Sequence, residues 1–344
     1  MPRSTDLTTD ERSDLDAARQ GDEAAFTRLV EAHRRPLHAH CYRMLGSVHD
    51  ADDALQDTLL AAWKGLGGFA GTGSFRSWLY RIATNASIRV GERRRRRVLT
   101  PDLGPAYTQV WDLGETVTES VFIEPYPDAG LADRSGATEP EARYDLLESV
   151  ELGFVAALQD LPATQRAVLV LREVLAIPAT EVAETLDTTV AAVNSALQRA
   201  RKTMEGRLDP VTQQVTRRAL GDDGEQQLVR SFVRAWEQHD VDGLVGLLAA
   251  DARLTMPPMP AWFEGRDAIG RFFAERAFAD EWKLVPSTAS GQLAVVGYRG
   301  NDAGAYPLQN LNVLTLRGRQ IVALDCFHDP TIHPRFRLPP EAPA

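Results

Sequence analysis

The fold of this chain is indicated most directly by the stretch Phe75-Arg76-Ser77-Trp78-Leu79-Tyr80-Arg81-Ile82-Ala83-Thr84-Asn85, which runs on into five consecutive arginines at residues 93–97. Aromatic side chains hold unstacked bases, and arginines neutralise phosphate. A second basic helical pattern, at residues 178–202, has the layout of a helix-turn-helix that reads the major groove. The two patterns together predict a protein that contacts DNA at two places.

The bulk composition is that of a cytoplasmic protein with several domains. A chain of 344 residues with 44% hydrophobic content predicts two or three domains, each with its own core. No apolar run approaches the roughly 20 residues that span a bilayer, and the acidic N-terminus does not resemble a secretory signal. Cys41 and Cys326 show no disulfide or zinc spacing, so we expect reduced thiols.

Charge is distributed unevenly along the chain, whose formal net charge is −10. Residues 76–97 hold 8 basic and 1 acidic side chain, whereas residues 98–151 hold 2 basic and 12 acidic ones. A protein with this balance does not coat nucleic acid by bulk attraction. We expect it to bind DNA weakly alone and to need a partner.

The N-terminal part is predicted to be helical. Apolar residues recur at helical spacing over residues 22–63, which predicts three helices with a break at Gly46-Ser47. A glycine-rich loop at residues 65–73 precedes a further helix over residues 74–95.

Proline, glycine and acidic residues alternate over residues 98–141 and predict a linker. Within it, Val110-Trp111 and Val121-Phe122-Ile123 are apolar enough to serve as anchoring points. Apolar residues recur at helical spacing again from Leu146. Residues 161–165 predict a break and a helix start, and three more helices are expected to follow.

The helix-turn-helix is predicted in detail. Residues 177–186 form a first helix opened by proline, residues 187–189 a tight turn with capping groups, and residues 190–204 a second helix. Its inward side chains are expected to be Val193, Leu197 and Ala200, with the polar side chains facing out toward base edges and phosphates. The alternative is an ordinary three-helix bundle with a solvated polar face.

After about residue 222 the pattern changes to helices followed by strands. Two helical stripes, at residues 228–236 and 241–248, precede four apolar stretches bounded by glycine and proline. This order predicts a separate α+β domain. The expected strands cover residues 253–256, 293–298, 310–316 and 321–325.

Residues 20–97 and 146–208 resemble the extracytoplasmic-function branch of the sigma-70 family, bacterial factors that bring RNA polymerase to promoters. Residues 50–63 look like the family's polymerase-binding helix, and residues 78–85 like its promoter-melting helix. The resemblance implies two all-α sigma domains: region 2 at residues 1–97 and the region 4 helix-turn-helix at 146–210. The acidic linker between them, at residues 98–145, would thread through the polymerase near the RNA exit path.

The resemblance also implies partners and roles for single residues. The protein partners would be the beta-prime clamp helices and the beta flap of core polymerase, and the nucleic-acid partner would be promoter DNA. The clamp helices would meet Asp53, Gln56 and Asp57. The minus-10 element would be held by a base-cradling loop and the basic aromatic helix, through Phe69, Gly71, Thr72, Ser74, Trp78, Tyr80, Arg81, Arg93 and Arg94. The minus-35 element would be read by Thr189, Asn194, Ser195, Gln198, Arg199 and Lys202.

Some residues depart from the family pattern or allow another interpretation. Basic residues are usual near positions 194 and 196, where this chain has Asn194 and Ala196, so we expect weaker minus-35 binding. The arginines at 93–97 would alternatively be a solvated helix end suited to the helix dipole. A histidine and cysteine cluster at residues 33–41 lacks the ligands and spacing of a zinc module, and we expect neither a metal nor a cofactor.

The C-terminal part, residues 222–335, resembles the SnoaL-like branch of the nuclear-transport-factor-2 fold, a cone of helices against a curved sheet. This fold hosts enzymes, binders and assembly modules. An acid or imidazole in its apolar pocket would serve as a general base, and a filled core is the alternative. The candidate pocket for a small-molecule ligand comprises Trp236, Met256, Trp262, Phe263, Trp282, Asp325 and His328.

The sequence therefore predicts a promoter-specific sigma factor, not an enzyme, whose C-terminal domain modulates its activity. A DNA-binding regulator with a ligand-sensing or enzymatic SnoaL-like domain is the alternative. A third interpretation, a repressor that uses only the helix-turn-helix, conflicts with the acidic balance.

Overall fold

The computed structural model describes residues 8–69, 74–118, 121–129, 131, 145–208 and 211–343. The chain forms two compact units, and neither is continuous along the sequence. The first, which we call the helical unit, contains Met1–Arg96, Gly130–Ser149 and Gly153–Leu208. The second, the α+β unit, contains Arg97–Ala129, Val150–Leu152 and Asp209–Ala344. The expected fold class is confirmed, with helical domains followed by a mixed-sheet domain.

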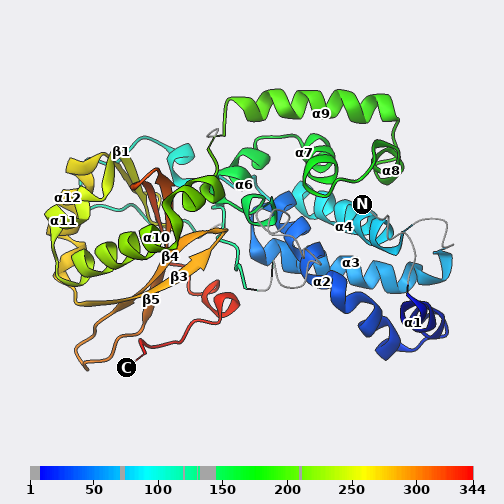
Figure 1. Cartoon of the computed structure of the whole chain (residues 1–344), viewed down its shortest axis with the longest axis horizontal. Coiled ribbons are helices and arrows are strands. Elements are labelled where there is room, and N and C mark those ends of the chain that lie inside the picture. The colour runs from blue at the N-terminus through cyan, green and yellow to red at the C-terminus, as the bar shows by residue number, and fades with distance from the viewer. Residues whose placement is uncertain are drawn as a thin grey trace. The chain divides into compact units, whose positions relative to one another are not determined.

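The helical unit consists of two groups of helices, coloured blue to cyan and green in Figure 1. The first group is α1 (Thr9–Arg19), α2 (Glu23–Leu45), α3 (Val48–Gly65), the short 3-10 turn η1 (Leu66–Gly68) and α4 (Phe75–Glu92). The second is α6 (Leu152–Gln159), α7 (Ala163–Leu169), the π-helical turn η3 (Val170–Val174), α8 (Ala179–Thr185) and α9 (Val190–Glu205).

Residues 22–63 form two helices rather than the three predicted. Pro36 lies inside α2 and does not end it. Asp22 caps the start of α2 by accepting the N–H groups of Ala24 and Ala25, and Gly46 ends it in the left-handed conformation. Buried side chains line α2 on both sides of Pro36, so tertiary packing outweighs the lost backbone hydrogen bond.

The helix-turn-helix agrees with its prediction to within two residues at each boundary. Asp187 makes the turn with a φ of 49°, and the Thr189 hydroxyl accepts the Ala192 N–H at 3.1 Å to cap α9. Val193, Leu197 and Ala200 are buried as expected. Ala196 is buried beside them.

The α+β unit is built on one six-stranded sheet in the order β2-β1-β6-β5-β4-β3. All neighbouring strands are antiparallel except β1 and β6, which are parallel. Two strands, β2 and β3, were not predicted. The strands are β1 (Leu248–Thr255), β2 (Trp262–Glu264), β3 (Trp282–Ala289), β4 (Gln292–Arg299), β5 (Leu308–Arg317) and β6 (Gln320–Phe327).

Helices cover one face of this sheet (Figure 1). Phe232 and Trp236 of α10 and Phe273 of α12 pack there against Val295 and Leu314 of the strands. Short 3-10 turns complete the unit. Its helices and turns are α10 (Gln213–Glu237), α11 (Val241–Gly246), α12 (Arg266–Glu275), η2 (Thr100–Leu103), η4 (Ala277–Ala279) and η5 (His333–Phe336).

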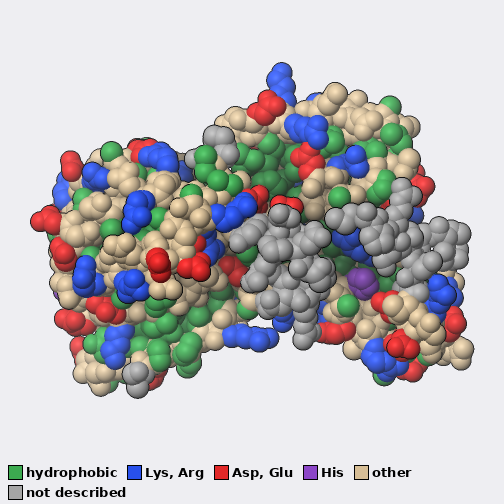
Figure 2. Space-filling view, viewed as in Figure 1, with side chains coloured by type: hydrophobic (Ala, Val, Ile, Leu, Met, Phe, Trp, Pro, Cys, Tyr) green, Lys and Arg blue, Asp and Glu red, His purple; other side chains and the backbone are tan. Residues whose placement is uncertain are grey.

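Part of the predicted linker belongs to the α+β unit. Val110 is buried within the hydrophobic core of that unit, as its predicted anchoring role requires, whereas Trp111 is 64% exposed. Residues 121–123 are also buried. Acidic and basic side chains are interspersed on the visible surface of this unit, at the left of Figure 2. Among the described residues, no helix is long and apolar enough to cross a membrane.

Candidate polymerase-binding and DNA-binding surfaces

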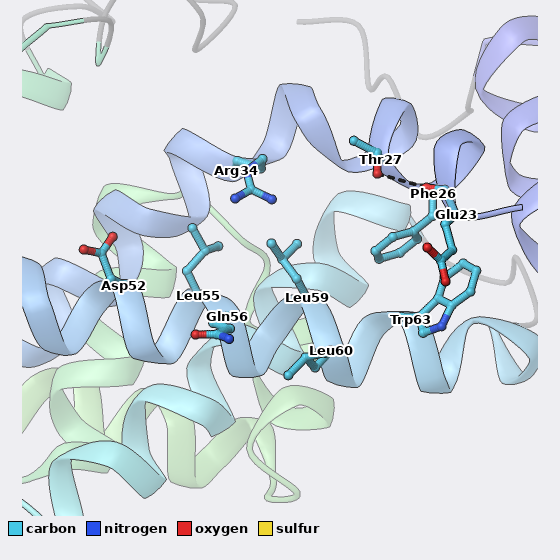
Figure 3. A pocket seen from close by; sticks show the side chains of 10 residues that line it. All are labelled: Glu23, Phe26, Thr27, Arg34, Asp52, Leu55, Gln56, Leu59, Leu60 and Trp63. Carbon is cyan, nitrogen blue, oxygen red and sulfur yellow. Dashed lines mark hydrogen bonds between the residues drawn. The ribbon is translucent and has the colours of Figure 1, made fainter.

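A groove of about 650 Å³ lies between α2 and α3. Leu55 and Leu59 point from α3 toward α2, and Phe26 of α2 packs edge-on against Trp63 with ring centroids 5.1 Å apart (Figure 3). The groove therefore combines an apolar floor with a charged rim. Its lining comprises Glu23, Phe26, Thr27, Arg34, Asp52, Leu55, Gln56, Leu59, Leu60 and Trp63.

The predicted polymerase-binding residues lie on the exposed side of α3. Asp53, Gln56 and Asp57 are all exposed, and Gln56 also lines the groove. Leu60, which the sequence analysis did not single out, also lines the groove and is 50% exposed. The sequence signal for Leu60 is its position: it lies next to the apolar stripe of α3, where a surface helix usually carries a polar residue.

One predicted polymerase-binding residue contacts one predicted DNA-binding residue. Arg94 lies 3.7 Å from the Asp53 carboxylate and 3.4 Å from that of Asp50. Because Arg94 and Asp53 are both more than half exposed, this ion pair contributes little to stability. The contact nevertheless joins the end of α4 to the exposed face of α3.

The predicted minus-10 residues around the start of α4 form an aromatic cluster. Phe69 lies 5.2 Å from Trp78 and 5.5 Å from Phe75, measured between ring centroids. Ser74 caps α4 by accepting the Ser77 N–H. Gly71 and Thr72 of the predicted base-cradling loop lie outside the described residues.

Accessibility differs sharply among the other predicted minus-10 residues. Arg81, Arg93 and Arg94 are exposed, and Trp78 is half-buried. Tyr80 is only 3% exposed, and the guanidinium of Arg76 lies 5.3 Å from its ring centroid. In this conformation Tyr80 supports α4 from within and does not present its ring to a strand.

A buried histidine holds α4 against α2. His40 Nε2 lies 2.9 Å from Thr84 Oγ1, and the His40 ring packs edge-on against Tyr80. Burial lowers the pKa of His40 to about 3, so the imidazole is neutral at neutral pH. Cys41 is buried beside it, and no group of three His, Cys, Asp or Glu side chains suited to a metal ion occurs among the described residues.

The helix-turn-helix group packs against α4, the predicted minus-10 helix, within the same unit. The Ser77 hydroxyl of α4 donates to the Glu181 carboxylate of α8 at 2.7 Å. Arg166 of α7 reaches the Met44 carbonyl at the end of α2, and burial lowers its pKa to about 10. Asp160 pairs with both Arg96 and Arg207. Charged side chains therefore join the two groups of helices.

The reading helix α9 leaves its predicted DNA-contacting face open. This face is polar and carries two positive charges, which suits contact with base edges and phosphates. Thr189, Asn194, Ser195, Gln198, Arg199 and Lys202 are all exposed.

The candidate pocket residues of the α+β unit do not line a single cavity. Trp236, Met256, Phe263 and Trp282 belong to the core on the helix-covered face. Trp262 and Asp325 are each paired across the sheet with Thr255, so they lie on the opposite face from Phe263, which pairs with Leu254.

The two candidate general bases of this unit are also buried in unlike surroundings. Asp325 accepts a hydrogen bond from the Thr255 hydroxyl at 2.8 Å, and burial raises its pKa. Burial lowers the pKa of His328 to about 4, and its Nδ1 lies 3.5 Å from Gln309 Nε2. The acid therefore lies on the sheet face away from the aromatic core rather than inside it.

The ECF RNA polymerase sigma factor SigG of Mycobacterium tuberculosis strain H37Rv is 40% identical to this chain over 327 residues, which are 93% of this chain and 85% of SigG. This chain is an ECF sigma factor. The ECF sigma factor SigW of Bacillus subtilis is 29% identical over 192 residues, 55% of this chain and 92% of SigW.

Three family models match this sigma factor. Sigma-70 region 2 matches residues 29–98, sigma-70 region 4 matches residues 152–204, and the SnoaL-like domain matches residues 229–324. Helices α3 and α4 therefore lie in region 2, and the predicted DNA-contacting residues of α9 lie in region 4.

A crystal structure of the ECF sigma factor SigJ of Mycobacterium tuberculosis has the same fold. It superposes on this sigma factor with a TM-score of 0.53 at 22% identity, covering 89% of this chain and 97% of SigJ. Sigma factors bind RNA polymerase and promoter DNA and are in general not enzymes. The predicted family, fold and general function are thereby confirmed.

Proposed function

We propose that this sigma factor docks on core polymerase through the α2/α3 groove, with the beta-prime clamp helices as the occupant. The observation that carries the proposal is the half-exposed Leu60 beside an apolar floor with a charged rim. An exposed leucine at such a site supplies buried apolar area on binding, and Asp53 and Asp57 give the surface its charge complementarity toward basic partners.

Promoter DNA binds to two helices in this proposal. The exposed face of α9 reads the minus-35 element, with the beta flap as its polymerase partner. Arg81, Arg93 and the aromatic cluster at the start of α4 hold the melted minus-10 strand. The contact between Ser77 and Glu181 must then break before α4 meets DNA, since it places α8 against that helix.

The α+β unit modulates transcription and performs no catalytic turnover in this proposal. Its acid and its aromatic core lie on opposite faces of the sheet, which disfavours a general base within an apolar pocket. Its packing with residues 97–129 and 150–152, which flank the two sigma regions, supports a regulatory role.

Changing Leu60 to Asp tests the docking surface. The substitution places a charge in the apolar contact, and we expect the affinity for core polymerase to fall at least about tenfold, the factor that 1.4 kcal/mol corresponds to. Val215→Asp is the matched control, because Val215 is 44% exposed and lies on α10 of the other unit. Pull-down with core polymerase and run-off transcription measure both variants. Equal binding by Leu60→Asp and the wild type would exclude this groove as the polymerase-binding site.

A further inference from the structure

The first half of the reading helix α9, with its cap, carries no charged side chain. Residues 189–198 read Thr-Val-Ala-Ala-Val-Asn-Ser-Ala-Leu-Gln, and we call the exposed members of this run the neutral segment. Its members are Thr189, Val190, Ala191, Ala192, Asn194, Ser195 and Gln198. Every positive charge of α9 lies beyond them, within residues 199–202.

The position of these charges decides which contacts α9 makes. In a helix-turn-helix the N-terminal residues of the second helix contact base edges in the major groove, while basic side chains also contact phosphate. Arg199 and Lys202 are exposed beyond the neutral segment, and Arg201 pairs with Glu173 at 2.6 Å. Arginine and lysine make the commonest specific contact with guanine. The neutral segment therefore has no side chain for that contact.

Two amide side chains, Asn194 and Gln198, lie on one side of the neutral segment. Positions four apart on a helix are neighbours, about 6 Å apart along its axis. Both amides are exposed, and neither hydrogen-bonds to another described residue. A carboxamide holds an acceptor beside a donor, which match the N6 amino group and N7 of adenine. Successive base pairs lie about 3.4 Å apart, so the two amides can contact adenines one or two base pairs apart.

An apolar side chain precedes the two amides on the same side of the helix. Val190 is the first residue of α9, four positions before Asn194, and is 38% exposed. The core of the helical unit therefore does not account for a valine at this position. In the major groove only thymine presents a methyl group, and apolar side chains contact it. An exposed valine in line with two amides suits a thymine close to adenines.

We propose that α9 reads an A·T-rich core within the minus-35 element. Asn194 and Gln198 each pair with an adenine, and Val190 packs against a thymine methyl group. Arg199 and Lys202 hold phosphates beside this core and contribute affinity without sequence preference. The inference rests on the proposed function, because it assigns bases to the face that α9 presents to the minus-35 element.

Holoenzyme assembled from core polymerase and the full-length sigma factor tests this base preference. A promoter library randomised at both elements is bound, and the templates retained in heparin-resistant complexes are sequenced. We expect two upstream positions at which adenine is favoured at least about fivefold over each other base. An upstream element selected only for G·C pairs would overturn the proposal.

Substitutions at Asn194 identify its base. Asn194→Ala should lower the adenine preference at one of the two positions at least about fivefold and leave the other unchanged. Asn194→Arg should move the preference at that position to guanine, a gain that loss of folding cannot produce. Thr203→Ala is the matched control, because Thr203 is exposed on the last turn of α9, outside the neutral segment. Wild-type base preference in both Asn194 variants would overturn the assignment.

Replacement of thymine by uracil tests the contact with Val190. Uracil pairs as thymine does and lacks only the methyl group. When each selected upstream thymine is replaced in turn, one replacement should weaken binding of the wild-type holoenzyme about two- to fourfold. Val190→Ser removes the apolar contact, so its holoenzyme should tolerate the same replacement. An equal response to uracil in the wild type and Val190→Ser would overturn the thymine contact.

Failure of the proposed function would give a different result. A sigma factor that does not bind core polymerase, or a holoenzyme that selects no upstream element, would refute the proposed function. A holoenzyme that selects a G·C-rich upstream element would refute the base assignment alone.

Discussion

The two helices that we assign to DNA differ in how much of their contact surface is free. All six predicted contact residues on or capping α9 are exposed, whereas on α4 Tyr80 is buried, Trp78 is half-buried and Ser77 is hydrogen-bonded to α8. Helix α9 is amphipathic and packs on one side only. Helix α4 packs on α2 beneath it and on α8 beside it.

This difference implies that the two proposed DNA contacts require different steps. A duplex has its base edges exposed in the major groove, so a preformed polar face such as that of α9 can read it directly. A melted strand must place its bases against aromatic side chains, and those of α4 are engaged within the protein. Binding at α4 therefore requires rearrangement, while binding at α9 does not. Each prediction below breaks or sharpens this contrast.

The largest expected effect is a loss of α4 packing in acid. His40 has a pKa of about 3 in the folded protein and an ordinary value of 6.5, so between these values the unfolded chain binds a proton that the folded protein does not. The stability that neutral His40 supplies is therefore fully present above about pH 6.5. The free energy of unfolding falls by about 1.4 kcal/mol for each pH unit from there down to the folded pKa of His40. Hydrogen exchange at pH 7 and pH 5 measures this, and α4 should lose protection before α9.

His40→Gln provides the control for this prediction. Glutamine keeps a donor near Thr84 and does not titrate, so the share of the pH dependence that His40 supplies should disappear between pH 7 and pH 5, while His33 of α2, whose pKa burial also lowers, keeps its own share. Identical pH dependence in the wild type and His40→Gln would assign the effect to other groups. Uniform loss of protection across α4 and α9 would remove the contrast between the helices.

Local features of the chain were predictable because local chemistry decides them. The turn at Asp187, the cap at Thr189 and the buried stripe that includes Val193 all follow from residues within one helical turn of each other. The same reasoning wrongly divided α2 into two helices, because packing of α2 outweighs the local helix breaker Pro36. It also missed β2 and β3, which the sheet stabilises.

Contacts between distant residues were not predictable from sequence pattern. The pairing of Glu181 with Ser77 and the approach of Gly114 to Pro260 each join positions more than 100 residues apart. The candidate pocket is an intermediate case. Trp262 and Phe263 are consecutive, so if they lie in a strand their side chains must point to opposite faces. A strand at these two residues is therefore enough to divide the predicted pocket between the two faces of the sheet.

An intermediate effect is expected from a pair of neighbouring substitutions on α9. Val193 is fully buried, and Val193→Ala removes apolar contact and leaves a cavity, which should lower the free energy of unfolding by about 2 kcal/mol. Asn194 is exposed, so Asn194→Ala should leave stability unchanged and weaken duplex binding by about 1–2 kcal/mol. Urea unfolding and minus-35 duplex binding at one fixed salt concentration separate the two effects. If Asn194→Ala destabilised the protein as much as Val193→Ala, the face assigned to DNA would be structural.

The smallest expected effect comes from freeing α4 of its contact with α8. Glu181→Ala removes the acceptor of the Ser77 hydroxyl, a contact worth roughly 1 kcal/mol because it is only part-buried. The full-length variant should bind a random single-stranded DNA library about fivefold more tightly, measured by fluorescence anisotropy. Glu184→Ala is the matched control, because Glu184 is exposed on the same helix and its removal changes the charge equally.

Ser77→Ala should reproduce the effect of Glu181→Ala, and the double variant should add nothing further, since both remove one hydrogen bond. If Glu184→Ala tightened binding as much as Glu181→Ala, the gain would come from lost negative charge, and α4 would be as free for DNA as α9 already is.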